Sequence, residues 1–308
     1  MKRAARVGPI LFVVLAFVAS ACAKSTPGTS GSPSPSVSPT PAVDIAKCET
    51  AQGTQAPTAP KGVDYKTQLK EPGVLNIGSD NDFPPFEEIK PGAKTPDGFD
   101  VDIYTEVAKR LGLTAKSTTT NFDALFTSSV PTGKFDLGVS AITIKESRKQ
   151  TVDFTIPYFR SDLSLAINTQ KTPTIKTVDD LVGQVIGVQK GTTGEACAQY
   201  LQTQGKVKDV KSFDNTGPAI QDLLAGRVGA VINDRPATQG YIDRGAPTLK
   251  VVQIIKTQEE YGFAISKDKP DLRKAINDAL TAMMTDGTYS TIYKKWFGTV
   301  PPFAVPFQ

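Results

Sequence analysis

The residues of this chain that could do chemistry favour the capture of a small charged molecule over the breaking of a bond. Arg148 supplies a planar guanidinium, which can hold a carboxylate through two parallel hydrogen bonds. The run Gly191–Gly194 precedes a helical pattern, so it can offer an anion the free N–H groups of a helix N-terminus. Asp234 ends the apolar run 230–232 and would need a cationic partner if it is buried. Together these groups predict a site that holds a free amino acid by both of its charged ends.

Each of these residues also has an ordinary structural explanation. Arg148 lies in the charged run Lys145–Lys149, which would suit a protein surface. Gly191–Gly194 could be a plain tight turn, whereas a phosphate loop is disfavoured because no Gly-Lys-Ser/Thr ending follows. Asp234 could cap the helix expected after Pro236. The ordered occurrence of the whole set favours ligand binding.

Composition narrows the function further. The 308 residues include no histidine, which excludes Ser-His-Asp and Cys-His nucleophiles and imidazole metal sites. The formal net charge of +4 includes the charges of Lys2, Arg3 and Arg6, so the rest of the chain is nearly neutral and gives no support for nucleic-acid binding. We expect neither a metal nor another cofactor.

The N-terminus has the organisation of an export signal. Basic residues precede the apolar run Ile10–Ala19, which is too short for a membrane span and predicts a signal peptide over residues 1–21. The residues before Cys22 resemble a bacterial lipobox, although Ala19 stands where leucine is usual and an ordinary signal peptidase could also cut there. The next stretch is almost wholly Ser, Thr, Pro and Gly, which is typical of an extended tether. We expect residues 22–62 to tether a protein held outside the cytoplasm, on the cell membrane, by a lipid such as palmitate on Cys22.

Two further cysteines, Cys48 and Cys197, form an even pair. In an exported protein such a pair can persist as a disulfide, which would attach the chain after the tether to the second lobe. The alternative is two unpaired thiols.

From Val74 the sequence alternates short apolar runs with helical patterns, which is typical of layered α/β proteins with mostly parallel sheets. Strands are predicted at 74–78, 135–139, 163–168, 184–188, 230–233 and 249–255. Helices are predicted at 100–111, 193–204, 219–224, 272–283 and 288–297. The candidate site residues follow predicted strands, and parallel sheets place their ligands at the carboxyl ends of strands.

Between about Val74 and Gly298 the chain resembles the extracellular solute-binding proteins that feed polar amino acids to ABC importers. The most specific matching segments are Asp80–Glu87, Ile142–Arg148 and Asp286–Gly298.

The resemblance implies a two-lobed α/β fold of the periplasmic-binding-protein type (type II), in which each lobe is a mostly parallel sheet flanked by helices. Two hinge strands would join the lobes near 158–162 and 257–261. Lobe 1 would comprise 63–158 and 262–300, lobe 2 would comprise 159–261, and 301–308 would form a C-terminal tail.

The resemblance also assigns roles to the residues that hold the charged ends of the ligand. Arg148, the hydroxyl and N–H of Thr143, and the N–H of Thr193 would bind the α-carboxylate. Asp234 and the backbone C=O of Ala141 would bind the ammonium group.

Five more residues would surround the side chain of the ligand. Phe83 and Phe122 would form its walls, and Asp80, Gln189 and Asn233 would face its polar atoms. Asp80 would accept hydrogen bonds from an amide, guanidinium or ammonium group and would repel a carboxylate. Position 189 is lysine in some relatives and glutamine here. Both features favour glutamine or a basic amino acid over glutamate and aspartate.

We therefore expect a monomeric, non-enzymatic lipoprotein that binds a polar L-amino acid between two closing lobes and delivers it to an ABC permease. Two alternatives stay open. An exported cyclohexadienyl or arogenate-type dehydratase shares this fold and could use Arg148 for a carboxylate, but it needs a general acid in the cleft. A ligand-presenting sensor would depend on a signalling partner, because no signalling domain follows Gly298 in this sequence.

Overall fold

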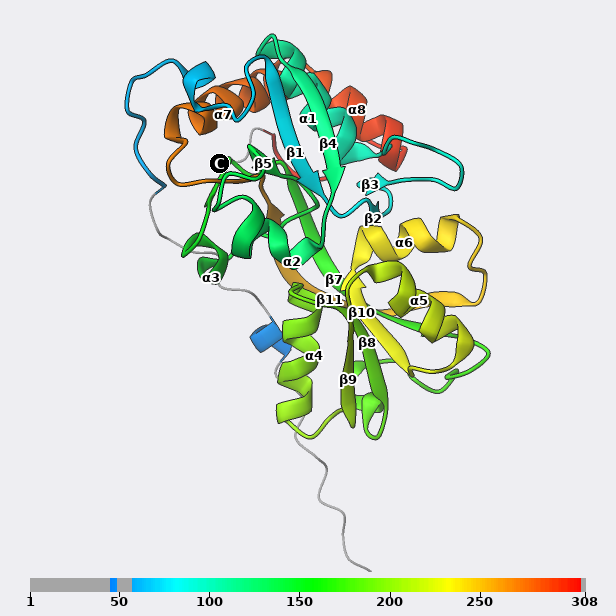
Figure 1. Ribbon diagram of the computed structural model, residues 1–308. Coiled ribbons are helices and arrows are strands. Elements are labelled where there is room, and N and C mark those ends of the chain that lie inside the picture. The colour runs from blue at the N-terminus through cyan, green and yellow to red at the C-terminus, as the bar shows by residue number, and fades with distance from the viewer. Residues whose placement is uncertain (1–44, 49–56, 306–308) are drawn as a thin grey trace, which may run out of the picture. The chain divides into compact units, whose positions relative to one another are not determined.

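The computed structural model describes residues 45–48 and 57–305. The predicted signal peptide, Cys22 and the part of the predicted tether before residue 45 lie outside these residues. The described chain forms two α/β lobes, each built on a five-stranded sheet (Figure 1). None of its helices combines the length and the apolar character that crossing a membrane requires.

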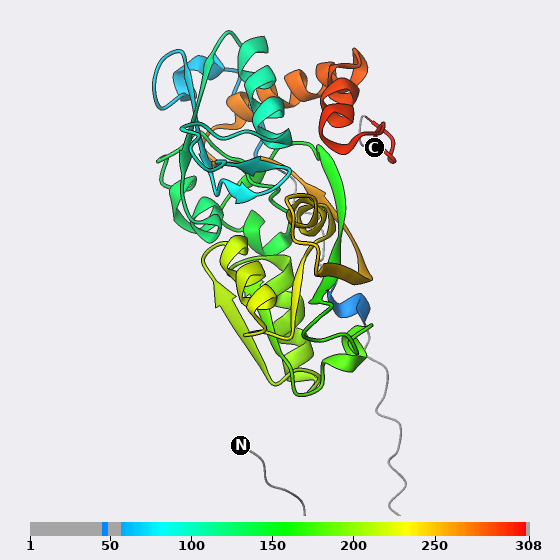
Figure 2. The same ribbon diagram turned by 90° about the vertical axis from the view of Figure 1, so that its right-hand side faces the viewer.

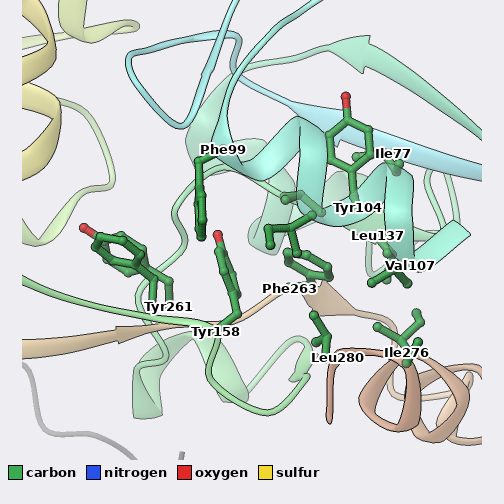
Figure 3. Packing of buried hydrophobic residues seen from close by; sticks show 14 of the residues in the cluster. Ile77, Phe99, Tyr104, Val107, Leu137, Tyr158, Tyr261, Phe263, Ile276 and Leu280 are labelled. Atoms are coloured by element: carbon green, nitrogen blue, oxygen red, sulfur yellow. The ribbon is translucent and has the colours of Figure 1, made fainter. Parts of the chain in front are cut away.

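The first lobe is built on a sheet with the strand order β4-β1-β5-β12-β6. Its strands are β1 (Val74–Ser79), β4 (Thr114–Thr119), β5 (Leu137–Gly138), β6 (Asp153–Phe154) and β12 (Ala264–Ile265). Its longer helices are α1 (Phe99–Arg110), α7 (Pro270–Thr285) and α8 (Thr288–Phe297). Figure 3 shows how Val107 of α1 and Ile276 and Leu280 of α7 gather around Leu137 and Phe263 in the larger core. The chain thus takes its last two helices back into the first lobe.

The second lobe is built on a sheet with the strand order β11-β7-β10-β8-β9. Its strands are β7 (Phe159–Asn168), β8 (Val185–Gln189), β9 (Asp209–Phe213), β10 (Ala230–Asp234) and β11 (Leu249–Tyr261). Its helices are α4 (Thr193–Thr203), α5 (Thr216–Ala225) and α6 (Arg235–Asp243). Apolar side chains of α4 and α5 pack in two separate core clusters of this lobe.

The prediction of mostly parallel sheets is confirmed, because four of the five strands in each of the two described sheets run in one direction and a single strand runs against them. Among the described strands, β1 runs parallel to β4 and β5, but β12 runs antiparallel to β5 and β6. In the second sheet β8 runs parallel to β9 and β10, but β7 runs antiparallel to β10 and β11. The strands that run against the others are β7, by which the chain enters the second lobe, and β12, which follows its return to the first lobe. The returning strand β11 pairs with β7 in the opposite direction, as a strand that retraces its path does most simply.

Strands β7 and β11 lie side by side and continue from the second lobe to the first (Figure 2). The expected crossings near 158–162 and 257–261 lie on these two strands. Their register shifts between Ile255 and Glu259, and Gln258 there has a left-handed backbone with φ 50°. The carboxylate of Asp162 accepts the N–H groups of Thr257 and Gln258, each at 3.0 Å, and so fixes this irregularity.

The loop of the first lobe that contains Pro84 and Pro85 lies against the second lobe. The N–H of Gly217 in α5 donates to a carboxylate oxygen of Asp82 at 3.0 Å. Gly240 in α6 faces the carbonyl of Pro84, and a Cβ at position 240 would lie 2.5 Å from that oxygen. This loop carries β2 (Asp82–Phe83) and β3 (Glu87–Glu88).

Other short elements are α2 (Phe122–Ala124), α3 (Glu146–Lys149), η1 (Ile45–Cys48), η2 (Tyr65–Gln68), η3 (Leu125–Ser129) and η4 (Val178–Leu181).

A disulfide joins Cys48 of η1 to Cys197 of α4, with 4.5 Å between their Cα atoms. Both cysteines are buried in the core of the second lobe. From Thr58 the chain is held by the first lobe, since its N–H donates to Asp153 at 2.8 Å and its carbonyl accepts from Arg273 at 2.6 Å. The segment before β1 is therefore attached to both lobes.

Candidate functional site

A small cavity of about 10 Å³ lies between the lobes, and residues of both lobes line it. Eight of the ten residues expected at a ligand site line this cavity: Phe83, Phe122, Ala141, Thr143, Arg148, Gln189, Thr193 and Asp234. Ser140 and Thr192 line it as well. Of the ten, Asp80 and Asn233 do not.

Arg148 is buried at the cavity, with 4% of its surface exposed, and is not a surface residue. Its guanidinium donates to the carbonyl of Thr143 at 2.7 Å and to that of Gly191 at 2.8 Å, so it touches both lobes. It also stacks on Phe126 and Phe122, with 4.4 and 5.2 Å between guanidinium and ring centres. Burial lowers its pKa to about 10, which leaves it charged at neutral pH. Two of its five N–H groups are used by these carbonyls, and the others remain for an anion.

Helix α4 begins at Thr193, as the Gly-Thr-Thr-Gly run predicts. The hydroxyl of Thr192 caps the helix by accepting the N–H of Glu195 at 3.0 Å. The first N–H groups of a helix have no partner within it, so those of Thr193 and Gly194, which precede the capped Glu195, are available to an anion beside Arg148. Gly194 allows α4 to approach β10, because a Cβ there would lie 2.6 Å from the carbonyl oxygen of Ile232.

Asp234 lies at the end of β10 with a buried carboxylate. It occupies the N-cap position of α6, but its side chain makes no capping hydrogen bond. The hydroxyl of Tyr261 donates to it instead. Burial, together with the neighbouring carboxylate of Glu259, raises the pKa of Asp234 to about 8. An ammonium group is the kind of partner that would stabilise its charged form.

Asp80 and Gln189 contact each other across the lobes. The amide nitrogen of Gln189 donates to Asp80 at 2.9 Å, and the amide of Asn215 donates to its other oxygen. Burial raises the pKa of Asp80 to about 7. Asp80 is therefore adjacent to the cavity through Gln189 and does not line it.

Asn233 is the expected site residue that the structure places furthest from its predicted role. It is buried, but it does not line the cavity, and its amide nitrogen has no hydrogen-bond partner among the described residues. Neighbouring side chains of a strand point to opposite faces, so Asn233 and Asp234 cannot both point from β10 into the same cavity.

The aromatic walls and the Ala141 loop are held by buried contacts. Phe83 stacks with Phe86 at a ring-centre distance of 6.0 Å, and Phe122 meets Phe126 edge-on at 5.5 Å. Ala141 has a left-handed backbone with φ 45°, a conformation that costs a non-glycine residue roughly 1 kcal/mol or more. Its N–H donates to the buried Asp100 at 2.8 Å, which holds the loop in this conformation.

The sequence interpretation missed Glu259 of β11, which is fully buried beside the cavity. One of its oxygens accepts the hydroxyl of Thr143 at 2.6 Å and that of Thr193 at 3.0 Å. The single proton of the Thr143 hydroxyl is donated to Glu259 here, so the expected bond from this hydroxyl to the ligand carboxylate would require it to turn away from Glu259. The signal in the sequence was the pair Glu259-Glu260 inside a strand, where alternation turns one of two neighbours inward.

Five buried carboxyl groups should make stability depend on pH. Burial raises the pKa of Asp80 to about 7, of Asp100 to about 6 and of Asp234 to about 8, and it also raises those of Glu87 and Glu259. In the unfolded chain such groups titrate near pH 4, so the folded protein holds protons that the unfolded chain has lost. Their contribution to stability is complete below about pH 4 and declines as the pH rises through 6 to 8. We expect the melting temperature of the ligand-free protein to fall by roughly 5 °C or more between pH 5 and pH 8. Calorimetry at constant ionic strength checks this, and a melting temperature that rises over that interval would contradict it.

Residues 75–299 match the family model of the bacterial extracellular solute-binding proteins, family 3. The L-cystine-binding protein of Escherichia coli (strain K12) is 34% identical over 231 residues, which cover 75% of this chain and 85% of that protein. The ABC transporter arginine-binding protein 1 of the same strain is 32% identical over 228 residues, which cover 72% of this chain and 90% of that protein. A solved structure of an ancestral arginine-binding protein bound to arginine has a TM-score of 0.69 and 36% identity, covering 73% of this chain and 99% of that chain. Each of these relatives is named as a binding protein.

Proposed function

The chain belongs to family 3 of the bacterial extracellular solute-binding proteins, and we infer from this that it captures a polar amino acid outside the cytoplasm and hands it to an ABC permease. Its role is binding and not catalysis, as it is for the relatives compared above. The amino acid is held between the two lobes by its charged ends.

The buried guanidinium of Arg148, with Asp234 at the same cavity, is the observation that carries this proposal. A buried cation and a buried carboxylate that do not bond to each other suit the two ends of a zwitterion. The α-carboxylate would take the remaining N–H groups of Arg148 and the first N–H groups of α4. The ammonium group would take Asp234 and the carbonyl of Ala141.

Ligand entry requires the lobes to separate. A cavity of about 10 Å³ has room for about one water molecule and not for an amino acid. Strands β7 and β11 connect the lobes, and the irregular segment between Ile255 and Glu259 is suited to absorb the change in backbone angles. Binding is then the closure of the two lobes on the ligand.

We propose glutamine or a basic amino acid as the ligand, in preference to glutamate or aspartate. Asp80 lies next to the cavity and can receive a donor from a guanidinium, ammonium or amide group once Gln189 has moved aside. The names of two relatives point to arginine, and that of another to cystine, whose far end carries an ammonium group beside a carboxylate. A carboxylate side chain would meet Asp80 as a like charge.

A thermal-shift screen of the twenty amino acids and L-cystine tests the proposal. A ligand that binds only the folded state stabilises it and so raises the melting temperature. The free energy of unfolding increases by about 2.7 kcal/mol when the ligand concentration is a hundred times the dissociation constant. We expect a clear rise for at least one cationic or amide amino acid. A protein that none of these compounds stabilises would contradict the proposal.

We further propose that the mature protein is anchored to the membrane by a lipid on Cys22, which would be its first residue. The apolar run before Cys22 and the polar tether after it support this. Cys22→Ser should move the protein from the membrane fraction to the medium or periplasm and abolish labelling by radioactive palmitate. Cys48 is bonded to Cys197, so a Cys48→Ser variant provides a cysteine control that should keep the label. A wild-type protein that is released with Cys22 unmodified would contradict the anchor.

A further inference from the structure

Glu259 is placed where the two lobes and the hinge meet. It lies on β11 directly after the register shift, and Asp162 fixes the backbone just before it. The strand alternates here, so that Thr257, Glu259 and Tyr261 are buried while Gln258 is exposed and Glu260 is partly exposed. Glu260 pairs outside with Arg160 at 2.7 Å. Of the two neighbouring glutamates, the inward one contacts Thr143 and Thr193, which line the ligand cavity.

One oxygen of Glu259 joins three parts of the molecule. It belongs to the hinge strand, and it accepts the hydroxyl of Thr143 from the first lobe and that of Thr193 from the second. Thr193 begins α4, and Thr143 lends its carbonyl to Arg148. Both threonines therefore lie among the groups expected to hold the carboxylate of the ligand.

Fold stability does not explain a carboxylate at this position. Glu259 is fully buried, its second oxygen has no hydrogen-bond partner among the described residues, and the carboxylate of Asp234 lies close enough to raise its electrostatic energy. The cations that face it are Arg148 and, less closely, Lys145. Burying a carboxylate costs free energy unless it is fully paired and hydrogen-bonded, so a carboxylate with one unpartnered oxygen here points to a role in function.

We propose, building on the amino acid-binding function above, that Glu259 is a positioning residue that holds Thr143 and Thr193 together when the lobes close. Because each threonine hydroxyl donates to Glu259, the side-chain rotamers of both residues are fixed and their backbone N–H groups stay free for the ligand. When the lobes separate, the bond to Thr193 must break while Thr143 and Glu259 stay together, because the N–H of Ile144 donates to the carbonyl of Glu260 at 2.8 Å. Glu259 thereby favours the closed arrangement.

Three variants of the purified protein test this role of Glu259. Their affinity for the amino acid that stabilises the wild type most in the screen is measured by calorimetry. Glu259→Met removes the acceptor at similar length, Glu259→Gln keeps one oxygen, and Thr193→Val removes one donor but keeps its backbone N–H. Glu259→Met should weaken binding about 10- to 100-fold, the range for charge-assisted hydrogen bonds, without lowering the melting temperature of the ligand-free protein. Glu259→Gln should recover part of the loss. The matched control Glu260→Gln should bind like wild type.

The double variant Glu259→Met/Thr193→Val separates positioning from a general effect. If Glu259 acts through Thr193, the double variant should bind no more weakly than Glu259→Met alone, whereas independent effects would add. The proposal is overturned if both Glu259 variants bind within about threefold of wild type, or if the two losses add. It is also overturned if Glu259→Met binds more tightly, which is the sign expected when only a negative charge near the ligand carboxylate is removed. A wild-type protein that binds no amino acid would instead overturn the proposed function itself.

Discussion

Arg148→Ala is expected to weaken binding of the amino acid by a factor of about 30 to 1,000 or more, and this is the largest single effect we predict. Truncating one partner of a buried, charge-assisted pair costs about 2–5 kcal/mol, because the other charge is left without its partner. Arg148 also bonds to carbonyls of both lobes, so its loss removes a contact of the closed form as well.

Calorimetric titration of Arg148→Ala with the best ligand of the screen measures this effect. Arg227→Ala is a matched control, because Arg227 is exposed and pairs with Asp222 of its own lobe, away from the cavity. The control should bind like wild type. A loss of less than about tenfold in Arg148→Ala, in a protein that still unfolds cooperatively, would remove Arg148 from the site.

Asp80→Asn is expected to separate cationic from neutral ligands. Affinity for arginine or lysine should fall by roughly 30-fold or more, since a charge-assisted pair is lost, whereas affinity for glutamine should change less than about fivefold because an amide can pair with an amide. Glutamate, which wild-type Asp80 repels, should gain affinity. Asp97→Asn, an exposed carboxylate paired with Lys90, is the control.

The pH dependence of binding gives Asp80 a second test. Its pKa of about 7 means that at pH 6 the buried group holds a proton, which it must release before it can pair with a cation. Affinity of the wild type for arginine should therefore rise between pH 6 and pH 8, and Asp80→Asn should lose this contribution. Glutamate as the tightest ligand would refute the role of Asp80 and leave the roles of Arg148 and Asp234 unaffected.

The sequence predicts the fold well where burial imposes a clear period. The two-lobed α/β fold is confirmed, and the last helix, α8, has the predicted bounds because its apolar residues recur with helical spacing. Strands β4 (Thr114–Thr119) and β9 (Asp209–Phe213) were missed, because both lie at sheet edges, are largely exposed and carry polar residues. The single strand that runs against the others in each sheet, β12 or β7, was not singled out, since local sequence does not encode which distant strand becomes a neighbour.

At the site, the sequence indicated residues that lie in recognisable motifs and failed on those whose position depends on tertiary contacts. Arg148 and Thr193 are set by local helix starts, so their place follows from the neighbouring residues. Glu259 contacts the cavity residues Thr143 and Thr193 only because the irregular pairing of β11 with β7, a strand far away in the sequence, sets its register. Asn233 was assigned beside Asp234 although strand alternation separates the two side chains.

The disulfide between Cys48 and Cys197 determines how the protein carries a mechanical load. A pull along the chain from its N-terminal side reaches Cys48 first, and the covalent bond passes the force into α4 of the second lobe. The hydrogen bonds that hold Thr58 on the first lobe lie beyond this point and are shielded from the force. A molecule held from that side therefore keeps its second lobe as the stationary body, and the first lobe is the part that swings.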